Sequence, residues 1–241
     1  MSSLQGKVAF ITGGTKGIGY GIAEALLKQG VHVAITSRSD AAAQEAVRTL
    51  NSFGNESVYA KGYEADVRNL ESQQKAVSQA IQEFGAIDFV IANAGLGHFA
   101  SVEELTSEQW QETIDTNLTG VFYTLKATLD ALKKSEGYFI TISSLAGTNF
   151  FAGGAAYNAS KFGVTGFTQA AMLDLRGYNI KTTTIMPGSV ATHFNGNEPD
   201  DGDAWKIQIE DIGQMVVQLL NLPPRTLPSK IEVRPTRPPS S

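Results

Sequence analysis

The chain has 241 residues, 42% of them hydrophobic, and a formal net charge of −5. This length and apolar content predict one domain with a sizeable core, and the acidic balance argues against a nucleic-acid partner. Cysteine is absent and there are three histidines, which excludes disulfides and cysteine nucleophiles and predicts no bound metal. Neither a signal-peptide pattern nor a membrane-length apolar run is found, so we expect a cytoplasmic protein without a membrane partner.

Short apolar runs alternate with amphipathic helical patterns along the first half of the chain. Strands are predicted at residues 8–11, 31–35, 58–60 and 87–92. A helix that ends at Gly30 follows the first strand, and further helices are predicted at 40–50 and 70–84. This alternation is typical of β-α-β units with parallel strands buried on both faces.

The second half continues the pattern. Thr106 and Gln109 form a capping-box sequence that opens a helix. Further helices are predicted at 117–134, 155–175 and 209–220, and strands at 138–143, 180–186 and 231–233. The whole predicts an α/β protein, a single-domain Rossmann fold at 1–241. Its doubly wound, mostly parallel sheet has about seven strands with helices on both faces. Residues 234–241, rich in proline and serine, are expected to be an extended tail.

A glycine-rich loop lies directly between the first predicted strand and the first helix. Glycines at such a turn let the backbone approach a pyrophosphate, and the helix N-terminus supplies amide donors. A glycine-rich stretch alone is often only a loop, but this position favours nucleotide binding. The candidate residues are Gly13, Thr15, Lys16, Gly17, Ile18 and Gly19.

The end of the second predicted strand discriminates between cofactors. A carboxylate there would bind the adenosine ribose hydroxyls of NAD, whereas Ser37 and Arg38 occupy this place here. With Lys16 from the glycine loop, they offer two cations and a hydroxyl to a 2′-phosphate, which favours NADP(H). The alternative is that Arg38 and Lys16 are ordinary surface charges. Asp40 is expected to cap the next helix.

Tyr157 and Lys161 lie four residues apart within a predicted helix, so they share one face. A free tyrosine has a pKa of about 10, and it exchanges protons poorly near neutrality unless its anion is stabilised. A lysine cation beside it can supply part of that stabilisation. The spacing alone is a weak signal, because a half-buried tyrosine beside a surface lysine would give the same pattern.

Taken together, these motifs resemble those of the short-chain dehydrogenase/reductase family, and the chain looks like an NADP(H)-preferring member over nearly its whole length. The matching motifs lie at the carboxyl ends of the predicted strands or on the helices behind them. In chain order they are the glycine loop at 12–19, Asp66-Val67, Asn93-Ala94-Gly95, Asn117, Ser143-Ser144, Tyr157 with Lys161, and Pro187-Gly188.

The resemblance implies that Tyr157 donates a proton to a carbonyl oxygen as hydride arrives from the nicotinamide. It implies that Lys161 holds the nicotinamide ribose and lowers the pKa of Tyr157, that Ser144 hydrogen-bonds the reacting oxygen, and that Asn117 positions a water. Ser144 is preferred to Ser143 because its interval to Tyr157 matches the family's spacing. The implied cofactor contacts beyond the glycine loop, Ser37 and Arg38 are Asp66, Val67, Asn93, Ala94, Gly95, Tyr157, Lys161, Pro187, Gly188, Val190 and Thr192.

The loops expected to border the substrate are rich in aromatic residues, including Phe99, Phe151 and Phe194. They predict an apolar pocket for a small or aromatic ketone or aldehyde, although the same rings could pack into the core or a subunit contact. The segment 195–208 is short and acidic, which predicts an abbreviated lid and disfavours an anionic carrier protein.

Two other functions stay open: reduction of 3-oxoacyl groups on acyl carrier protein, and a non-catalytic NADP(H)-binding regulatory role. The expected partner is a small carbonyl or alcohol compound. The helices at 117–134 and 155–175 resemble the surfaces that pair in family homodimers and homotetramers.

Overall fold

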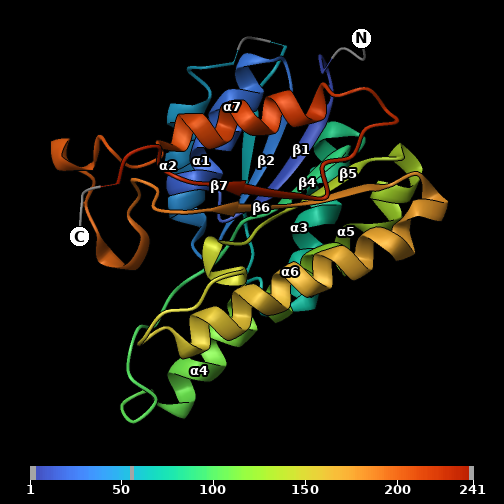
Figure 1. The fold of residues 1–241 in the computed structure, drawn as a ribbon. Coiled ribbons are helices and arrows are strands. Elements are labelled where there is room, and N and C mark those ends of the chain that lie inside the picture. Colours follow the sequence, from blue (N-terminus) through green and yellow to red (C-terminus); the bar gives the residue numbers. More distant parts are fainter. Residues whose placement is uncertain (1–3, 55–56, 239–241) are drawn as a thin grey trace.

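The computed structural model describes residues 4–54 and 57–238, which fold into one central sheet covered by helices (Figure 1). The strands are β1 (Val8–Thr12), β2 (His32–Ser37), β3 (Ala60–Glu64), β4 (Phe89–Ala92), β5 (Tyr138–Ile142), β6 (Lys181–Pro187) and β7 (Lys230–Val233). The helices are α1 (Gly17–Lys28), α2 (Asp40–Leu50), α3 (Leu70–Phe84), α4 (Ser107–Ile114), α5 (Gly120–Ser135), α6 (Ala155–Leu175) and α7 (Ile209–Leu220).

The seven strands are all parallel to their neighbours and follow the order β3-β2-β1-β4-β5-β6-β7. The chain starts in the middle at β1, winds outward to β3 and then crosses to β4 on the other side. This reversal leaves a crevice beyond the carboxyl ends of β1 and β4, where open α/β sheets bind ligands. The predicted single-domain Rossmann fold is confirmed.

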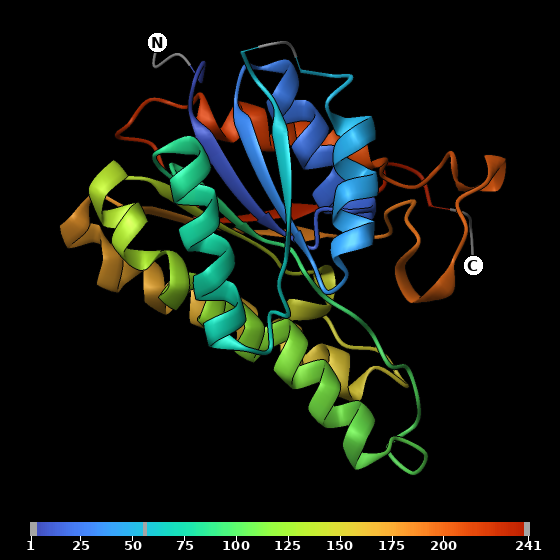
Figure 2. The ribbon, with the colours of Figure 1, turned by 180° about the vertical axis from the view of Figure 1, so that it is seen from behind.

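Helices cover both faces of the sheet, as Figures 1 and 2 show from opposite sides. One buried cluster joins α1, α2 and α7 to the sheet, with Ile22, Leu50 and Val216 among its members. The other joins α3, α5 and α6 to the sheet, with Phe139 and Val164 among its members. The central strands are thus buried from two sides, which explains their near-continuous apolar runs in the sequence.

Side-chain caps set several helix starts. The Thr106 side chain accepts from the Gln109 backbone and Gln109 reciprocates, so the predicted capping box opens α4. The expectation that Asp40 caps α2 is wrong. Ser39 lies one residue earlier in extended backbone and its hydroxyl accepts from Ala42 N, which leaves Asp40 in the first helical turn.

Most predicted boundaries lie within two residues of those in the structure, and two elements differ by more. The third strand runs from Ala60 to Glu64 rather than over 58–60, because it is an edge strand whose exposed Lys61 and Glu64 interrupt the apolar signal. The helix predicted at 117–134 is preceded by a π-helical turn at Asp115–Thr119, and α5 itself begins at Gly120. Such turns widen the backbone spacing and leave no periodic signature in the sequence.

Residues beyond β7 form no helix or strand up to Pro238, and residues 239–241 of the predicted tail lie outside the described residues. Among the described helices, none combines the length and apolar character needed to cross a membrane.

Candidate active site

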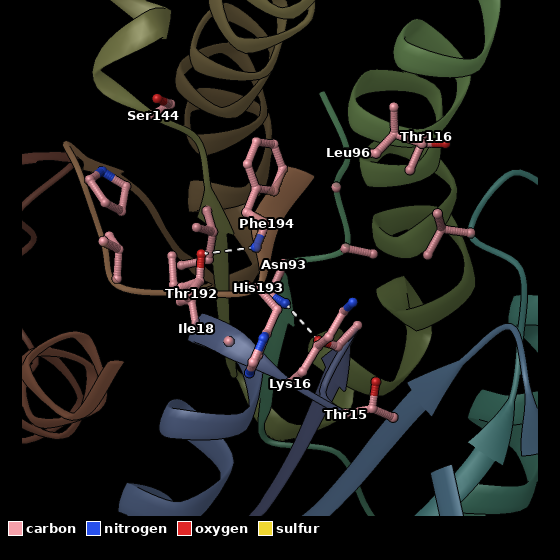
Figure 3. A pocket seen from close by; sticks show the side chains of 18 of the residues that line it. Thr15, Lys16, Ile18, Asn93, Leu96, Thr116, Ser144, Thr192, His193 and Phe194 are labelled. Carbon is pink, nitrogen blue, oxygen red and sulfur yellow. Dashed lines mark hydrogen bonds between the residues drawn. The ribbon is translucent and has the colours of Figure 1, made fainter. Parts of the chain in front are cut away.

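A cavity of about 500 Å³ opens at the carboxyl ends of the strands, at the crevice beside β1 and β4. Its lining brings together residues from the glycine loop, from the ends of β2 to β6 and from α6, and Figure 3 shows part of it. The predicted site residues that line it are Gly13, Thr15, Lys16, Gly17, Ile18, Ser37, Arg38, Asp66, Val67, Asn93, Ala94, Gly95, Ser144, Tyr157, Lys161, Pro187, Gly188, Val190 and Thr192. Gly19 and Asn117 are not among the lining residues.

The glycine loop is packed so closely that side chains are excluded. Gly13 has a φ of +66°, and a Cβ there would lie 2.9 Å from the Cα of Ala94. A Cβ on Gly19 would lie 2.5 Å from the Nδ2 atom of Asn93, which donates hydrogen bonds to the carbonyl oxygens of Thr12 and Gly13 at 3.0 Å each. Gly19 and Asn93 therefore shape the loop by holding its backbone.

The N-terminus of α1 faces the cavity and has no side-chain cap, because the residue before it, Lys16, has no hydrogen-bond acceptor on its side chain. Its first amides and its partial positive charge are thus directed toward the space that the glycines leave open. This cradle fits the pyrophosphate of a dinucleotide.

Arg38 and Asp66 line the cavity after β2 and β3, and each forms an ion pair with a residue outside the lining, Glu112 or Arg68. Asp66 accepts hydrogen bonds from the Arg68 guanidinium at 2.7 to 3.1 Å, and these bonds hold the pKa of Asp66 below its usual range. Arg38 is largely exposed and lies 4.0 Å from the carboxylate of Glu112. The Ser37 hydroxyl accepts from Ser39 N.

Tyr157 and Lys161 lie one turn apart on α6 and line the same cavity as Ser144. Burial raises the pKa of Tyr157, and a hydrogen bond with the Ser144 side chain opposes this rise. The Lys161 Nζ lies 5.6 Å from the centroid of the tyrosine ring and donates to the Ile142 carbonyl oxygen at 3.0 Å. Burial also lowers the pKa of Lys161 to about 8.

The expected lowering of the Tyr157 pKa by Lys161 is wrong for the chain by itself. Desolvation is the largest influence on the phenol, because a buried phenolate loses its hydration. Ser144, rather than Lys161, supplies the opposing influence. Burial also removes water from the Lys161 ammonium, which lowers its pKa and makes the proton easier to lose.

Asn117 lies in the π-helical turn and is buried. Its Nδ2 donates to the Leu96 carbonyl oxygen at 2.8 Å and to the Ser160 hydroxyl at 3.0 Å, while its Oδ1 accepts from Leu96 N at 2.9 Å. A Cβ on Gly95 would lie 3.3 Å from Asn117 Oδ1 and 3.7 Å from Lys161 Nζ. The missing side chain leaves space beside both polar atoms.

Aromatic rings surround Tyr157. The ring centroid of Phe99 lies 5.4 Å from that of Tyr157, and Phe194 lies 5.7 Å from it on another loop. Phe99 also contacts Phe194 at 6.3 Å and Phe151 at 5.9 Å. A Cβ on Gly97 would lie within 3.1 Å of both Phe99 and Phe194, so this glycine lets the two rings approach. The candidate reacting group thus lies against an apolar wall.

The sequence reading missed several lining residues, among them Thr36, Leu96, Thr116, Asn197 and Lys206. The hydroxyls of Thr36 and Thr116 are buried without a hydrogen-bond partner. None of these residues belongs to a motif, but Thr36, Leu96 and Thr116 directly adjoin the motif residues Ser37, Gly95 and Asn117, and this proximity could have indicated them.

A doubly wound parallel sheet with a glycine loop and a buried tyrosine–lysine pair at its switch point defines a dinucleotide-binding class of protein. Residues 7–203 match the family model described as short chain dehydrogenase. The chain therefore belongs to the short-chain dehydrogenase family of oxidoreductases.

Relatives span most of the chain. The trans-4-hydroxycyclohexanecarboxylate dehydrogenase of Sinomonas cyclohexanicum is 36% identical over 86% of this chain and 83% of its own. The 3-oxoacyl-[acyl-carrier-protein] reductase of Vibrio cholerae serotype O1 is 35% identical over 79% of this chain and 76% of its own. Among solved structures, an alcohol dehydrogenase from the archaeon Thermococcus sibiricus, complexed with 5-hydroxy-NADP, superposes with a TM-score of 0.89 at 30% identity, covering 98% of this chain and 99% of its own.

Proposed function

We propose that the protein is an NADP(H)-dependent oxidoreductase that interconverts a carbonyl group and an alcohol, with Tyr157 as its acid and base. The observation that carries this proposal is convergence: Ser144, Tyr157 and Lys161 line the same cavity as the glycine loop. A proton-transferring group and a dinucleotide cradle thus share one space. The related alcohol dehydrogenase complexed with 5-hydroxy-NADP supports a nicotinamide cofactor.

The nicotinamide, when bound, supplies or accepts the hydride. In reduction, Tyr157 gives its phenolic proton to the carbonyl oxygen, and Ser144 hydrogen-bonds the same oxygen. The raised pKa of Tyr157 keeps the phenol protonated at neutral pH but makes it a weaker acid, so proton donation requires that the phenolate be stabilised as it forms, and the Ser144 hydrogen bond acts in that direction. In alcohol oxidation the phenolate must form first, so that direction requires a higher pH or further stabilisation of the anion.

Lys161 holds the nicotinamide ribose and passes a proton toward Tyr157. With a pKa of about 8, it can exchange a proton near physiological pH far more readily than an ordinary lysine. The space beside Gly95 borders both Lys161 Nζ and Asn117 Oδ1 and would admit the water that links the lysine to solvent. Asn117 acts through its hold on Leu96 and the Gly95 loop.

The cofactor preference is inferred from the end of β2. Ser37 occupies the place where an acid would bind the ribose hydroxyls of NAD, and Arg38 and Lys16 line the same cavity. An Arg38→Ala substitution should weaken NADPH binding much more than NADH binding. A wild-type preference for NADH that survives Arg38→Ala would contradict this inference.

The substrate is inferred to be a small or aromatic ketone or aldehyde. Phe99, Phe151 and Phe194 give the wall around Tyr157 an apolar character that suits a flat or compact ring. The related reductase of acyl-carrier substrates favours a second candidate, a 3-oxoacyl group on a carrier protein. The acidic segment that includes Asp200, Asp201 and Asp203 argues against that anionic partner.

A spectrophotometric screen tests these alternatives. NADPH and NADH oxidation is followed with ketones, aldehydes, quinones, free 3-oxoesters and a 3-oxoacyl carrier thioester. We expect the highest kcat/KM for a cyclic or aromatic carbonyl compound with NADPH. Preference for the carrier thioester would establish the second candidate, and absence of turnover on every class would leave a non-catalytic binding role.

A further inference from the structure

Glu112 on α4 contacts three cationic or ionisable groups at the adenosine end of the cavity. Its Oε1 atom lies 4.0 Å from Arg38 Nη1 and 3.5 Å from Arg68 Nη1. Its Oε2 atom lies 2.9 Å from the Nε2 atom of His98. The Glu112 side chain thus places a carboxylate of α4 beside Arg38, the residue that follows β2.

The contact with His98 fixes the position of the carboxylate. His98 lies on the loop after β4, between Gly97 and the ring of Phe99 that packs on Tyr157. The hydrogen bond with His98 and the nearby arginines hold the pKa of Glu112 below its usual range. Glu112 is ionised at neutral pH, and its Oε1 atom lies within 4.0 Å of both arginines.

Glu112 is shared between the two arginines. Its Oε1 atom accepts from Arg68 Nη1 at 3.5 Å, while the Nε and Nη2 atoms of Arg68 donate to Asp66 at 2.7 to 3.1 Å. Arg38 makes its closest ion pair with Glu112, at 4.0 Å. Arg38 and Arg68 carry two positive charges, and Asp66 and Glu112 carry two negative charges. The net charge of these four side chains is therefore zero before a ligand binds.

We propose that Glu112 is a specificity-determining residue that competes with a 2′-phosphate for Arg38 and so limits the preference for NADP(H) over NAD(H). This inference rests on the proposed function, since it concerns the strength of the Arg38 contribution to cofactor binding. A phosphate at Arg38 would carry up to two negative charges close to the Glu112 carboxylate. Repulsion between this phosphate and the Glu112 carboxylate reduces the gain in NADP(H) affinity that Arg38 alone would give.

The nearly isosteric Glu112→Gln substitution isolates the charge. The amide oxygen can still accept a hydrogen bond from His98, whereas the repulsion of a phosphate is removed. We expect the affinity ratio of NADP⁺ to NAD⁺ to rise about fivefold at low ionic strength, and the gain to shrink in high salt because the groups are partly exposed. Adenosine 2′,5′-bisphosphate should bind more tightly by a similar factor, and adenosine 5′-monophosphate should not.

Calorimetric titration measures the dissociation constants of NADP⁺, NAD⁺, adenosine 2′,5′-bisphosphate and adenosine 5′-monophosphate. These constants do not depend on turnover. Glu108→Gln is the matched control. Glu108 lies one turn earlier on α4, so this substitution also removes one negative charge from the same helix. The control should change the ratio by less than about twofold.

An unchanged ratio in Glu112→Gln, or equal weakening of both dinucleotides, would overturn the inference while the proposed function stands. If wild-type protein binds neither NADP⁺ nor NAD⁺, the proposed function itself fails. The wild-type salt titration gives a second test: a phosphate-specific affinity that does not fall with salt would also contradict the inference.

Discussion

Lys161 is buried beside the ring of Tyr157, and this environment could not be predicted from the sequence. The spacing of Tyr157 and Lys161 predicted one shared helix face, which the structure bears out. Burial of Tyr157 depends on the loops that carry Phe99 and Phe194, which are distant from it in the chain. The pKa of Tyr157 is therefore raised rather than lowered, because desolvation arises from tertiary packing.

The lowered pKa of Lys161 predicts a pH dependence of stability. Since the pKa falls from 10.5 unfolded to about 8 folded, the unfolded chain binds the proton more tightly in between. Stability should therefore rise with pH across this window. Relative to Lys161→Met, the wild-type free energy of unfolding should increase by about 2 kcal/mol between about pH 7 and about pH 9.5. Urea unfolding of both proteins measures the difference, and parallel pH profiles would contradict the burial effect.

At the scale of elements, the buried strands and most helices could be predicted because their apolar patterns are long and regular. The edge strand β3 was misplaced, since Lys61 and Glu64 face solvent and break the apolar run. The π-helical turn at Asp115–Thr119 was missed because it depends on how Asn117 bonds to the Leu96 backbone. Tertiary contacts, rather than local preference, decide both features.

The crossing of α1 and α7 depends on glycine. A Cβ on Gly213 would lie 2.5 Å from the Gly21 carbonyl oxygen and 2.8 Å from the Ala25 Cβ. Gly213→Ala should therefore destabilise the protein by about 1 to 3 kcal/mol, since backbone must move. Gly166→Ala on α6 meets nothing within 4 Å and should stabilise by up to about 1 kcal/mol. Urea unfolding measures both, and equal effects would contradict this packing.

At the scale of the whole molecule, the doubly wound architecture followed from the alternation of elements and from the family resemblance. The substrate wall did not, because no local pattern brings Phe99, Phe151 and Phe194 to one place. The sequence also predicted self-association through α5 and α6. On these helices Phe122, Phe162 and Leu173 are exposed by 43%, 43% and 57%, and Phe122 meets Phe167 of α6 at 6.1 Å.

These exposed rings predict that the protein is a homodimer or homotetramer. Light scattering after size exclusion should give a mass of at least twice the 25.7 kDa chain. Phe162→Glu should shift the protein toward the monomer, because a charge buried without a partner opposes association. A wild-type monomer at micromolar concentration, or an unchanged mass in Phe162→Glu, would contradict self-association through this face.

The most direct test of the account is the turnover of Tyr157→Phe with the best carbonyl substrate from the screen and NADPH. The substitution removes the hydroxyl alone and keeps the ring that packs against Phe99 and Phe194. We predict that kcat falls by about 10²- to 10⁴-fold while NADPH binding, measured by fluorescence, stays within about twofold. A variant that reduces the substrate at the wild-type rate would contradict the assignment of Tyr157 as the acid and base.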